Sequence, residues 1–212
     1  MKILLAAGGA PQEWPEITGS EYDYHVGIDR GALYLLQQGF SLELAVGDFD
    51  SLNEEERTYV FSQAELVIQS PAEKDDTDTQ LALVSTFERY PDADYTLVGA
   101  TGGRLDHLLS NLWLGLEPRF QPYIQHLTLA DRQNNLSYYL PGSYSIKKIP
   151  EMKYLAYCCL TPVSHLDIKE SKYELENASI TQPTSYASNE FVSDTAKFSF
   201  ETGVIAVIQS KD

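Results

Sequence analysis

The chain has 212 residues, of which 43% are apolar and 11% aromatic, enough for one domain or two small ones with packed cores. Its net charge of −16, from 31 acidic and 15 basic residues, argues against binding nucleic acid through a basic surface. The adjacent cysteines Cys158 and Cys159 would point to opposite faces of a strand. We therefore expect no disulfide between them and a reduced, cytoplasmic setting.

Residues 2–7, which are apolar after Lys2, run directly into Gly8 and Gly9. This apolar run is too short for the core of a signal peptide, so it predicts a buried first strand that ends in a glycine turn. The sequence contains no apolar stretch long enough to predict a membrane-spanning helix.

Up to residue 126, short apolar runs alternate with helical periodicity, which predicts an open, mostly parallel α/β sheet. Gly31, Asn53 and Thr77 precede three of the helical segments and suit the N-cap position. The expected strands cover 2–7, 25–28, 44–46, 65–68 and 95–98, and the expected helices cover 32–38, 54–62, 78–90 and 106–116.

From residue 127 onward, Tyr, Ser, Thr, Ile and Val dominate and proline or glycine turns recur. Short strands with frequent turns, such as 136–140, 154–157 and 204–208, are typical of an antiparallel β-sandwich. We therefore predict two domains, an α/β domain over 1–126 and an all-β domain over 127–212.

The first acidic motif, Asp48 and Asp50, follows a predicted strand and the flexible Gly47. If the backbone stays extended there, the two carboxylates lie on one side about 6–7 Å apart, which suits one cation between them. A solvated turn that caps the next helix is the alternative interpretation.

The second acidic motif places Asp75, Asp76 and Asp78 after Lys74, at the start of a long amphipathic helix. The helix dipole favours one acid at this position whatever the function, but it explains three poorly. A helix N-terminus also attracts phosphate, and carboxylates beside it can carry a bridging metal.

The third motif is a glycine-rich turn after a strand, and it continues into Arg104, Asp106 and His107. Backbone N–H groups of Gly102 and Gly103 can cradle a phosphate that Arg104 grips with its guanidinium. Such turns are also common in α/β folds without phosphate sites, and a histidine at a helix start is more often a surface residue than a base.

Loops that leave the carboxyl ends of parallel strands meet along one edge of the sheet. Carboxylates gathered there need a cation, and Mg²⁺ with a nucleotide polyphosphate is the simplest explanation. A further strand-to-helix turn contains Asp29, which either caps its helix or faces the same edge; the spacing leaves both open.

Taken together and in order, these motifs resemble those of the bacterial thiamine pyrophosphokinases. The family's layout, an α/β domain followed by a β-sandwich, agrees with the division predicted above. The resemblance rests on residues 27–31, 47–51, 74–83, 99–107, 188–191 and 198–200 and on Gly203.

The resemblance implies transfer of a pyrophosphoryl group from ATP to the hydroxyl of thiamine, which gives AMP and thiamine diphosphate. It also implies a homodimer in which the site lies between subunits. Arg30 departs from the family, where many members carry a small residue. The resemblance implies that Asp48, Asp50 and Asp78 are Mg²⁺ ligands and that these three residues, with Arg104 and Asp106, are catalytic. It implies contacts with ATP from Asp29, Arg30, Thr101, Gly102, Gly103, Arg104 and His107. It implies contacts with thiamine from Ser188 and Asn189 of the partner subunit.

Two other functions remain as alternatives. A phosphatase of the haloacid dehalogenase type would use an apolar strand followed by Asp-Phe-Asp-Ser as its nucleophile loop, but it expects that motif on the first strand. A non-catalytic nucleotide- or vitamin-binding protein could share the same fold.

Overall fold

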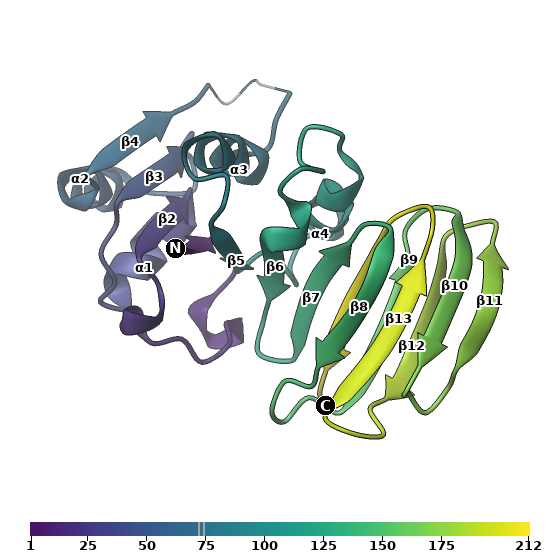
Figure 1. Ribbon diagram of the computed structural model, residues 1–212. Helices are drawn as coiled ribbons and strands as arrows, with labels where there is room; N and C mark the ends of the chain where they lie inside the picture. The colour runs from purple at the N-terminus through teal and green to yellow at the C-terminus, as the bar shows by residue number, and fades with distance from the viewer. Residues whose placement is uncertain (72, 74) are drawn as a thin grey trace. The chain divides into compact units, whose positions relative to one another are not determined.

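The computed structural model describes residues 1–71, 73 and 75–212. The chain forms two compact units (Figure 1). The first unit comprises Met1–Leu114 with Leu129–Arg132, and the second comprises Gly115–Thr128 with Gln133–Asp212.

The first unit is built on a parallel sheet in the order β5-β1-β2-β3-β4, with each neighbouring pair parallel. All five predicted strands of this region are confirmed to within one residue at either end. Their bounds are β1 (Lys2–Ala6), β2 (Tyr24–Ile28), β3 (Leu44–Gly47), β4 (Leu66–Gln69) and β5 (Asp94–Val98).

Three helices connect β2 to β3, β3 to β4 and β4 to β5, namely α1 (Arg30–Gln37), α2 (Glu54–Gln63) and α3 (Asp78–Arg89), and α4 (Leu105–Trp113) follows β5. Asn53 and Thr77 are confirmed as N-caps, because their side chains accept hydrogen bonds from Glu56 N and Gln80 N. The predicted cap at Gly31 is wrong, since α1 begins at Arg30, two residues before the predicted start, and Asp29 occupies the N-cap position. The fourth helix ends at Trp113, before a 3₁₀ turn over Leu114–Leu116.

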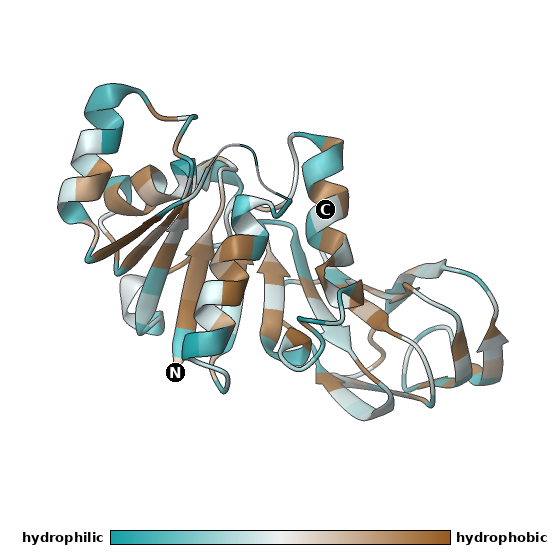
Figure 2. Ribbon diagram, turned by 90° about the horizontal axis from the view of Figure 1, so that it is seen from above, coloured by the Kyte–Doolittle hydropathy of each residue, from teal (hydrophilic) through white to brown (hydrophobic). Residues whose placement is uncertain are grey.

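Helices lie on both sides of this sheet, as the hydropathy view shows (Figure 2). Apolar side chains of α1, such as Ala32 and Leu35, pack with Phe49 and Val60 in a core cluster of the first unit. The parallel strands are covered on both faces, which explains why β2 is buried along its whole length.

The second unit contains two antiparallel sheets, in the orders β12-β9-β14-β7 and β11-β10-β13-β8. The predicted antiparallel sandwich is thereby confirmed. The bounds are β7 (Asn134–Tyr139), β8 (Gly142–Lys147), β9 (Tyr154–Cys159), β10 (Val163–Lys169), β11 (Leu175–Ile180), β12 (Thr184–Glu190), β13 (Thr195–Phe200) and β14 (Ile205–Ser210), and the short strand β6 (Leu127–Ala130) precedes them.

One core cluster draws side chains from both sheets of the second unit, including Tyr157 from β9 and Phe198 from β13. Alternate residues of β9 are buried, so Cys159 faces this core while Cys158 is only half-buried. Both cysteines are free, as expected from their adjacency.

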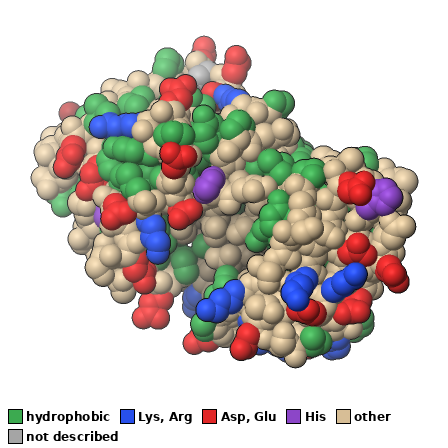
Figure 3. Space-filling model, viewed as in Figure 1, with side chains coloured by type: hydrophobic (Ala, Val, Ile, Leu, Met, Phe, Trp, Pro, Cys, Tyr) green, Lys and Arg blue, Asp and Glu red, His purple; other side chains and the backbone are tan. Residues whose placement is uncertain are grey.

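In the part of the chain that the structure describes, none of the helices has the length and apolar character needed to cross a membrane. On the face shown in Figure 3, basic side chains stand among acidic ones and form no continuous basic patch.

Candidate active site

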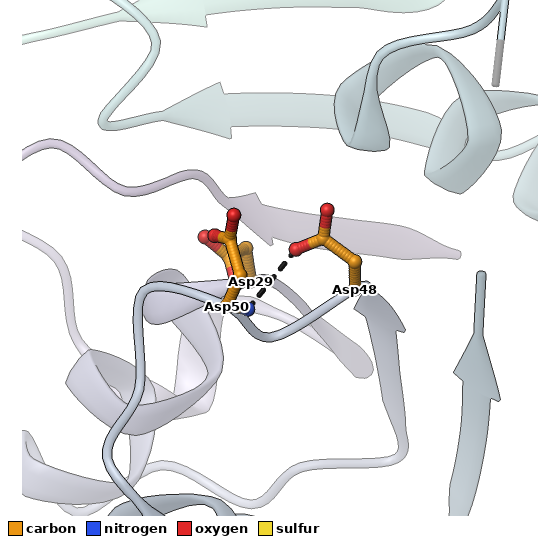
Figure 4. Close-up of side chains that lie close together, drawn as sticks. All are labelled: Asp29, Asp48 and Asp50. Atoms are coloured by element: carbon orange, nitrogen blue, oxygen red, sulfur yellow. Dashed lines mark hydrogen bonds between the residues drawn. The ribbon is translucent and has the colours of Figure 1, made fainter. Parts of the chain in front are cut away.

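The loop that follows β3 turns sharply between the two acids of the first motif. Phe49 has a φ of 59°, and the backbone N–H of Asp50 donates a 3.0 Å hydrogen bond to Oδ1 of Asp48. The predicted extended geometry at this point is therefore wrong. The turn nevertheless leaves the carboxylates of Asp48 and Asp50 close together (Figure 4).

The aromatic residue between the acids accounts for the turn. The side chain of Phe49 is fully buried and packs edge-on against Phe61 at 5.0 Å between ring centroids. Burial of this ring fixes an otherwise unfavourable backbone conformation, and the flanking Asp48 and Asp50 are left half-buried and exposed.

Asp29, which follows β2, completes a group of three carboxylates. Ligand oxygens of Asp29, Asp48 and Asp50 all lie within 4.8 Å of one another (Figure 4). Although Asp29 occupies the N-cap position of α1, its side chain makes no capping hydrogen bond. Close approach of the two loops favours Gly47, because its φ is 151° and a Cβ there would lie only 3.2 Å from Cα of Asp29.

The surroundings of Asp29 favour a positive partner. Its Oδ1 is buried and has no hydrogen-bond partner among the described residues. Burial raises the pKa of Asp29, hydrogen bonding with Ser51 and with the backbone of Arg30 offsets part of this rise, and the nearby charges of Asp78 and Asp48 add to it. Three hard oxygen donors with one buried, unsatisfied oxygen fit a divalent cation such as Mg²⁺.

Asp78 is the first residue of α3 and lies outside this group of three. It accepts a 3.3 Å hydrogen bond from Oγ of Ser70, the residue after β4. Its negative charge is also close enough to raise the pKa of Asp29. Asp75 and Asp76 lie in the loop before α3, and Lys74 falls outside the described residues.

The glycine-rich loop after β5 is anchored at Ala100 and Thr101 and is exposed beyond them, at Gly102 and Gly103. Oγ1 of Thr101 donates a 2.6 Å hydrogen bond to Asp131, and the buried Nδ2 of Asn111 donates to the carbonyl of Ala100 at 2.9 Å. Gly102 and Gly103 adopt left-handed φ values of 73° and 63°. Neither anchor was expected, because their residues lie 30 and 11 positions away along the chain.

Arg104 and Asp106 form an exposed two-point ion pair, with N–O distances of 3.1 and 2.6 Å. The Arg104 hydrogen bond lowers the pKa of Asp106 to about 2. A carboxylate this acidic is a poor proton acceptor near neutral pH, which argues against Asp106 as a general base in this conformation. His107, one residue further on, is exposed in the first turn of α4.

The guanidinium of Arg30 is engaged within the protein. It donates a hydrogen bond to the carbonyl of Ser51 and lies 3.4 Å from a carboxylate oxygen of Glu56. These contacts tie the start of α1 to the loop and helix that follow Asp50. Arg30 therefore has a local structural role beside its predicted contact with ATP.

Ser188 and Asn189 lie in the second unit, at an irregularity in the pairing of β12 with β9. Ser188 is exposed and has a φ of 58°, whereas Asn189 is 3% exposed. The amide of Asn189 bonds to both backbone polar groups of Tyr173. No pattern in the sequence indicates this long-range contact.

Comparison with known proteins identifies the family of the chain. The model of the thiamin pyrophosphokinase catalytic domain matches residues 18–125, and that of the thiamin pyrophosphokinase vitamin B1 binding domain matches residues 143–205. The chain is 35% identical to the thiamine pyrophosphokinase of Bacillus subtilis, with 99% of each chain covered.

Solved structures give the same result. The chain superimposes on a thiamin pyrophosphokinase family protein from Enterococcus faecalis with a TM-score of 0.98 and 58% identity, covering 100% of both chains. A thiamin pyrophosphokinase from Geobacillus thermodenitrificans gives a TM-score of 0.85 at 34% identity, covering 100% of this chain and 98% of the other. The chain therefore belongs to the thiamin pyrophosphokinase family.

Proposed function

We propose that this chain is a thiamine diphosphokinase, which transfers the pyrophosphoryl group of ATP to the hydroxyl of thiamine. Family membership supports this reaction. The observation that carries it furthest is the group formed by Asp29, Asp48 and Asp50, which shares the carboxyl edge of one parallel sheet with the Arg104 loop.

Asp48 and Asp50 hold Mg²⁺ in this proposal, and the oxygens of Asp29 are close enough to join them. Asp78, at the N-terminus of α3, is the further ligand expected from the family motif. When bound, the ion neutralises negative charge on the polyphosphate. The proposal thus assigns Asp29 as a metal ligand, whereas the sequence predicted a contact with ATP.

The reaction forms a bond between the thiamine hydroxyl oxygen and the β-phosphorus of ATP, and it breaks the bond from that phosphorus to the α,β-bridging oxygen. AMP departs with the bridging oxygen, and the hydroxyl proton passes to an acid of the motif loops. Backbone N–H groups of Gly102 and Gly103, with Thr101 and His107 beside them, bind phosphate oxygens. Arg104 offsets charge on the departing side, and Asp106 orients it.

In this proposal, the two regions of the chain bind different substrates. Residues 1–126 bind ATP and the metal, with Arg30 near the nucleotide, and residues 127–212 bind thiamine and form the dimer. Ser188 and Asn189 belong to the thiamine side, and a second copy of the chain completes each site. Free Cys158 and Cys159 support a cytoplasmic location.

The decisive experiment incubates the protein with ATP, MgCl₂ and thiamine and separates the nucleotides by chromatography. Formation of AMP and thiamine diphosphate in equal amounts is expected, with none when thiamine is omitted. Release of inorganic phosphate in place of AMP would establish the phosphatase alternative. Thiamine binding without any turnover would establish the binding protein.

A further inference from the structure

The glycine-rich loop after β5 is tied to the first unit at each of its first three residues. The carbonyl of Gly99 accepts a 2.9 Å hydrogen bond from the N–H of Gly9, in the loop after β1. The carbonyl of Ala100 accepts a bond of the same length from Nδ2 of Asn111, a residue of α4 that is 7% exposed. The contact at the third residue is different, because a side chain of the loop itself makes it.

This third contact joins Thr101 to Asp131, 30 positions further along the chain. Oγ1 of Thr101 donates a hydrogen bond of 2.6 Å to Oδ2 of Asp131. A short bond from a hydroxyl to a carboxylate belongs to the stronger class of hydrogen bonds in proteins. Asp131 belongs to the first unit, and the N–H of the next residue, Arg132, donates to the carbonyl of Glu13 at 2.8 Å. The hydroxyl of Thr101 is therefore bound to a segment that is itself held in place.

The bond to Asp131 decides what the hydroxyl of Thr101 can do toward a phosphate. A hydroxyl has one proton to donate, and its remaining capacity is to accept. The oxygens of an ionised phosphate act as acceptors. Because Thr101 donates its proton to Asp131, the same hydroxyl cannot also donate to a phosphate. The side chain of Thr101 therefore affects a nucleotide through the loop that it holds.

The two residues after Thr101 gain most from this anchor. Gly102 and Gly103 are exposed, and a Cβ at either position would meet no atom within 4 Å. Two consecutive glycines restrict the backbone little, so without an anchor their N–H groups would point in many directions. An anchor directly before them limits these directions. A loop that is ordered before ATP arrives loses less conformational entropy when ATP binds.

We propose that Thr101 is a positioning residue that acts through Asp131 and orders the two glycine N–H groups after it for the ATP phosphates. The proposal rests on the proposed function, in which this loop binds phosphate, and it adds how the loop is kept ordered. Thr101 then stands beside the phosphates with its backbone, whereas its hydroxyl is engaged with Asp131. Asp131 lies outside every motif found in the sequence, and this contact adds it to the site.

The anchor is tested with Thr101→Val and Thr101→Ser. Valine keeps the shape of threonine but has no hydroxyl, so the KM for ATP should rise about 5-fold to 50-fold while the KM for thiamine stays unchanged. Serine keeps the hydroxyl and should remain near the parent. An unchanged ATP KM in Thr101→Val would overturn the anchor.

Thr128→Val is the matched control for this substitution. Thr128 on β6 is also half-buried, and its hydroxyl also bonds to a side chain, with Oγ of Ser137 at 3.3 Å. The ATP KM of Thr128→Val should equal that of the parent. The comparison removes the general effect of replacing a half-buried hydroxyl by a methyl group.

The part played by Asp131 is tested by a double-mutant cycle between Thr101→Val and Asp131→Ala. Each single variant breaks the same bond, so both should raise the ATP KM by a similar factor, and the double variant should be no worse than either. A hydroxyl that contacted phosphate directly would instead give no effect in Asp131→Ala, or two effects that add. Either of these results would overturn the proposal.

The order of the loop is measured without any reaction. NMR relaxation of ¹⁵N-labelled protein, recorded without nucleotide, gives backbone order parameters for Gly102 and Gly103. Both should fall in Thr101→Val and stay near the parent in Thr101→Ser. If Asp131→Ala does not fold, this comparison replaces the cycle, and equal order parameters in the parent and Thr101→Val would reject the proposal.

ATP binding separates this proposal from the proposed reaction. Calorimetric titration with ATP and MgCl₂ in the absence of thiamine measures binding without turnover. Weaker binding in Thr101→Val than in the parent supports the anchor even if the parent yields no AMP with thiamine. Parent turnover with equal ATP binding in both proteins rejects the anchor and leaves the reaction standing.

Discussion

Oδ1 of Asp48 accepts a hydrogen bond of 3.0 Å from the backbone N–H of Asp50. When an aspartate side chain accepts a hydrogen bond from the backbone N–H two residues later, this bond takes the place of the backbone hydrogen bond that would otherwise close the turn. One oxygen of Asp48 therefore shapes the loop, and its carboxylate also belongs to the group of three acids. The structural and chemical roles of this residue can be separated by substitution.

Asp48→Asn keeps an oxygen that can accept the bond from Asp50 but removes the charge. We expect turnover to fall at least ~10²-fold, because the transition-state charge loses its counter-ion site. Circular dichroism should show an unchanged fold, and the exposed Asp92→Asn serves as the control. Near-normal turnover would remove Asp48 from the metal site.

Asp29→Asn should stabilise the metal-free protein. Since the pKa of Asp29 is raised in the folded state, its ionised form costs stability, and that cost grows as pH rises through the folded-state pKa. The melting temperature at neutral pH should therefore rise in Asp29→Asn, and added MgCl₂ should stabilise it less than the parent. An equal response to MgCl₂ in both proteins would exclude Asp29 as a ligand.

Arg104→Ala should reduce kcat/KM for ATP by about 10²-fold to 10³-fold without a measurable loss of stability. Its ion pair with Asp106 is largely exposed, and such pairs stabilise folds little. Lysine at this position should restore only part of the activity, because it lacks the two-point geometry. Arg119→Ala is the matched control, since Arg119 also pairs with a carboxylate two residues away.

Gly31→Ala should destabilise the first unit by about 1–3 kcal/mol or more. A Cβ at this position would lie 1.8 Å from the carbonyl oxygen of Ala6, so α1 could not pack against the end of β1. Gly8→Ala is the control, because no atom lies within 4 Å of a Cβ built there. Urea denaturation of the two variants measures the difference.

The cysteine pair should resist alkylation in the folded protein. Burial raises the pKa of Cys159 to about 11, so about one thiol in a thousand is ionised at pH 8. Burial also raises the pKa of Cys158. Mass spectrometry after iodoacetamide treatment at pH 8 should show slow labelling in buffer and rapid double labelling in urea. Fast labelling of the native protein would contradict this.

The division into α/β and antiparallel β regions was predictable because it depends on hydrophobic periodicity, which is visible within short stretches of the sequence. The caps Asn53 and Thr77 were predictable for the same reason, since each bonds three residues ahead. The turn at Phe49 was not, because burial against Phe61 places a bulky residue in the left-handed region. Such an effect depends on tertiary packing.

The contacts of Asn189 and Thr101 were also beyond sequence reasoning. Asn189 bonds to a residue 16 positions away, and Thr101 to one 30 positions away. A Ser-Asn pair in isolation is typical of a turn, and nothing in the sequence around Asp131 indicates its contact with Thr101. The position of Asp29 after β2 was a usable signal, because the loops of β2 and β3 leave adjacent parallel strands.

The strand order of the second unit has a consequence for how the protein is made. β14 lies between β7 and β9, so the middle of that sheet is the last of its strands to be synthesised. Until Ile205–Ser210 has left the ribosome, β7 and β9 each present an unpaired edge, and such edges invite aggregation. The α/β unit can take shape during translation, whereas the β unit must wait for its final strand.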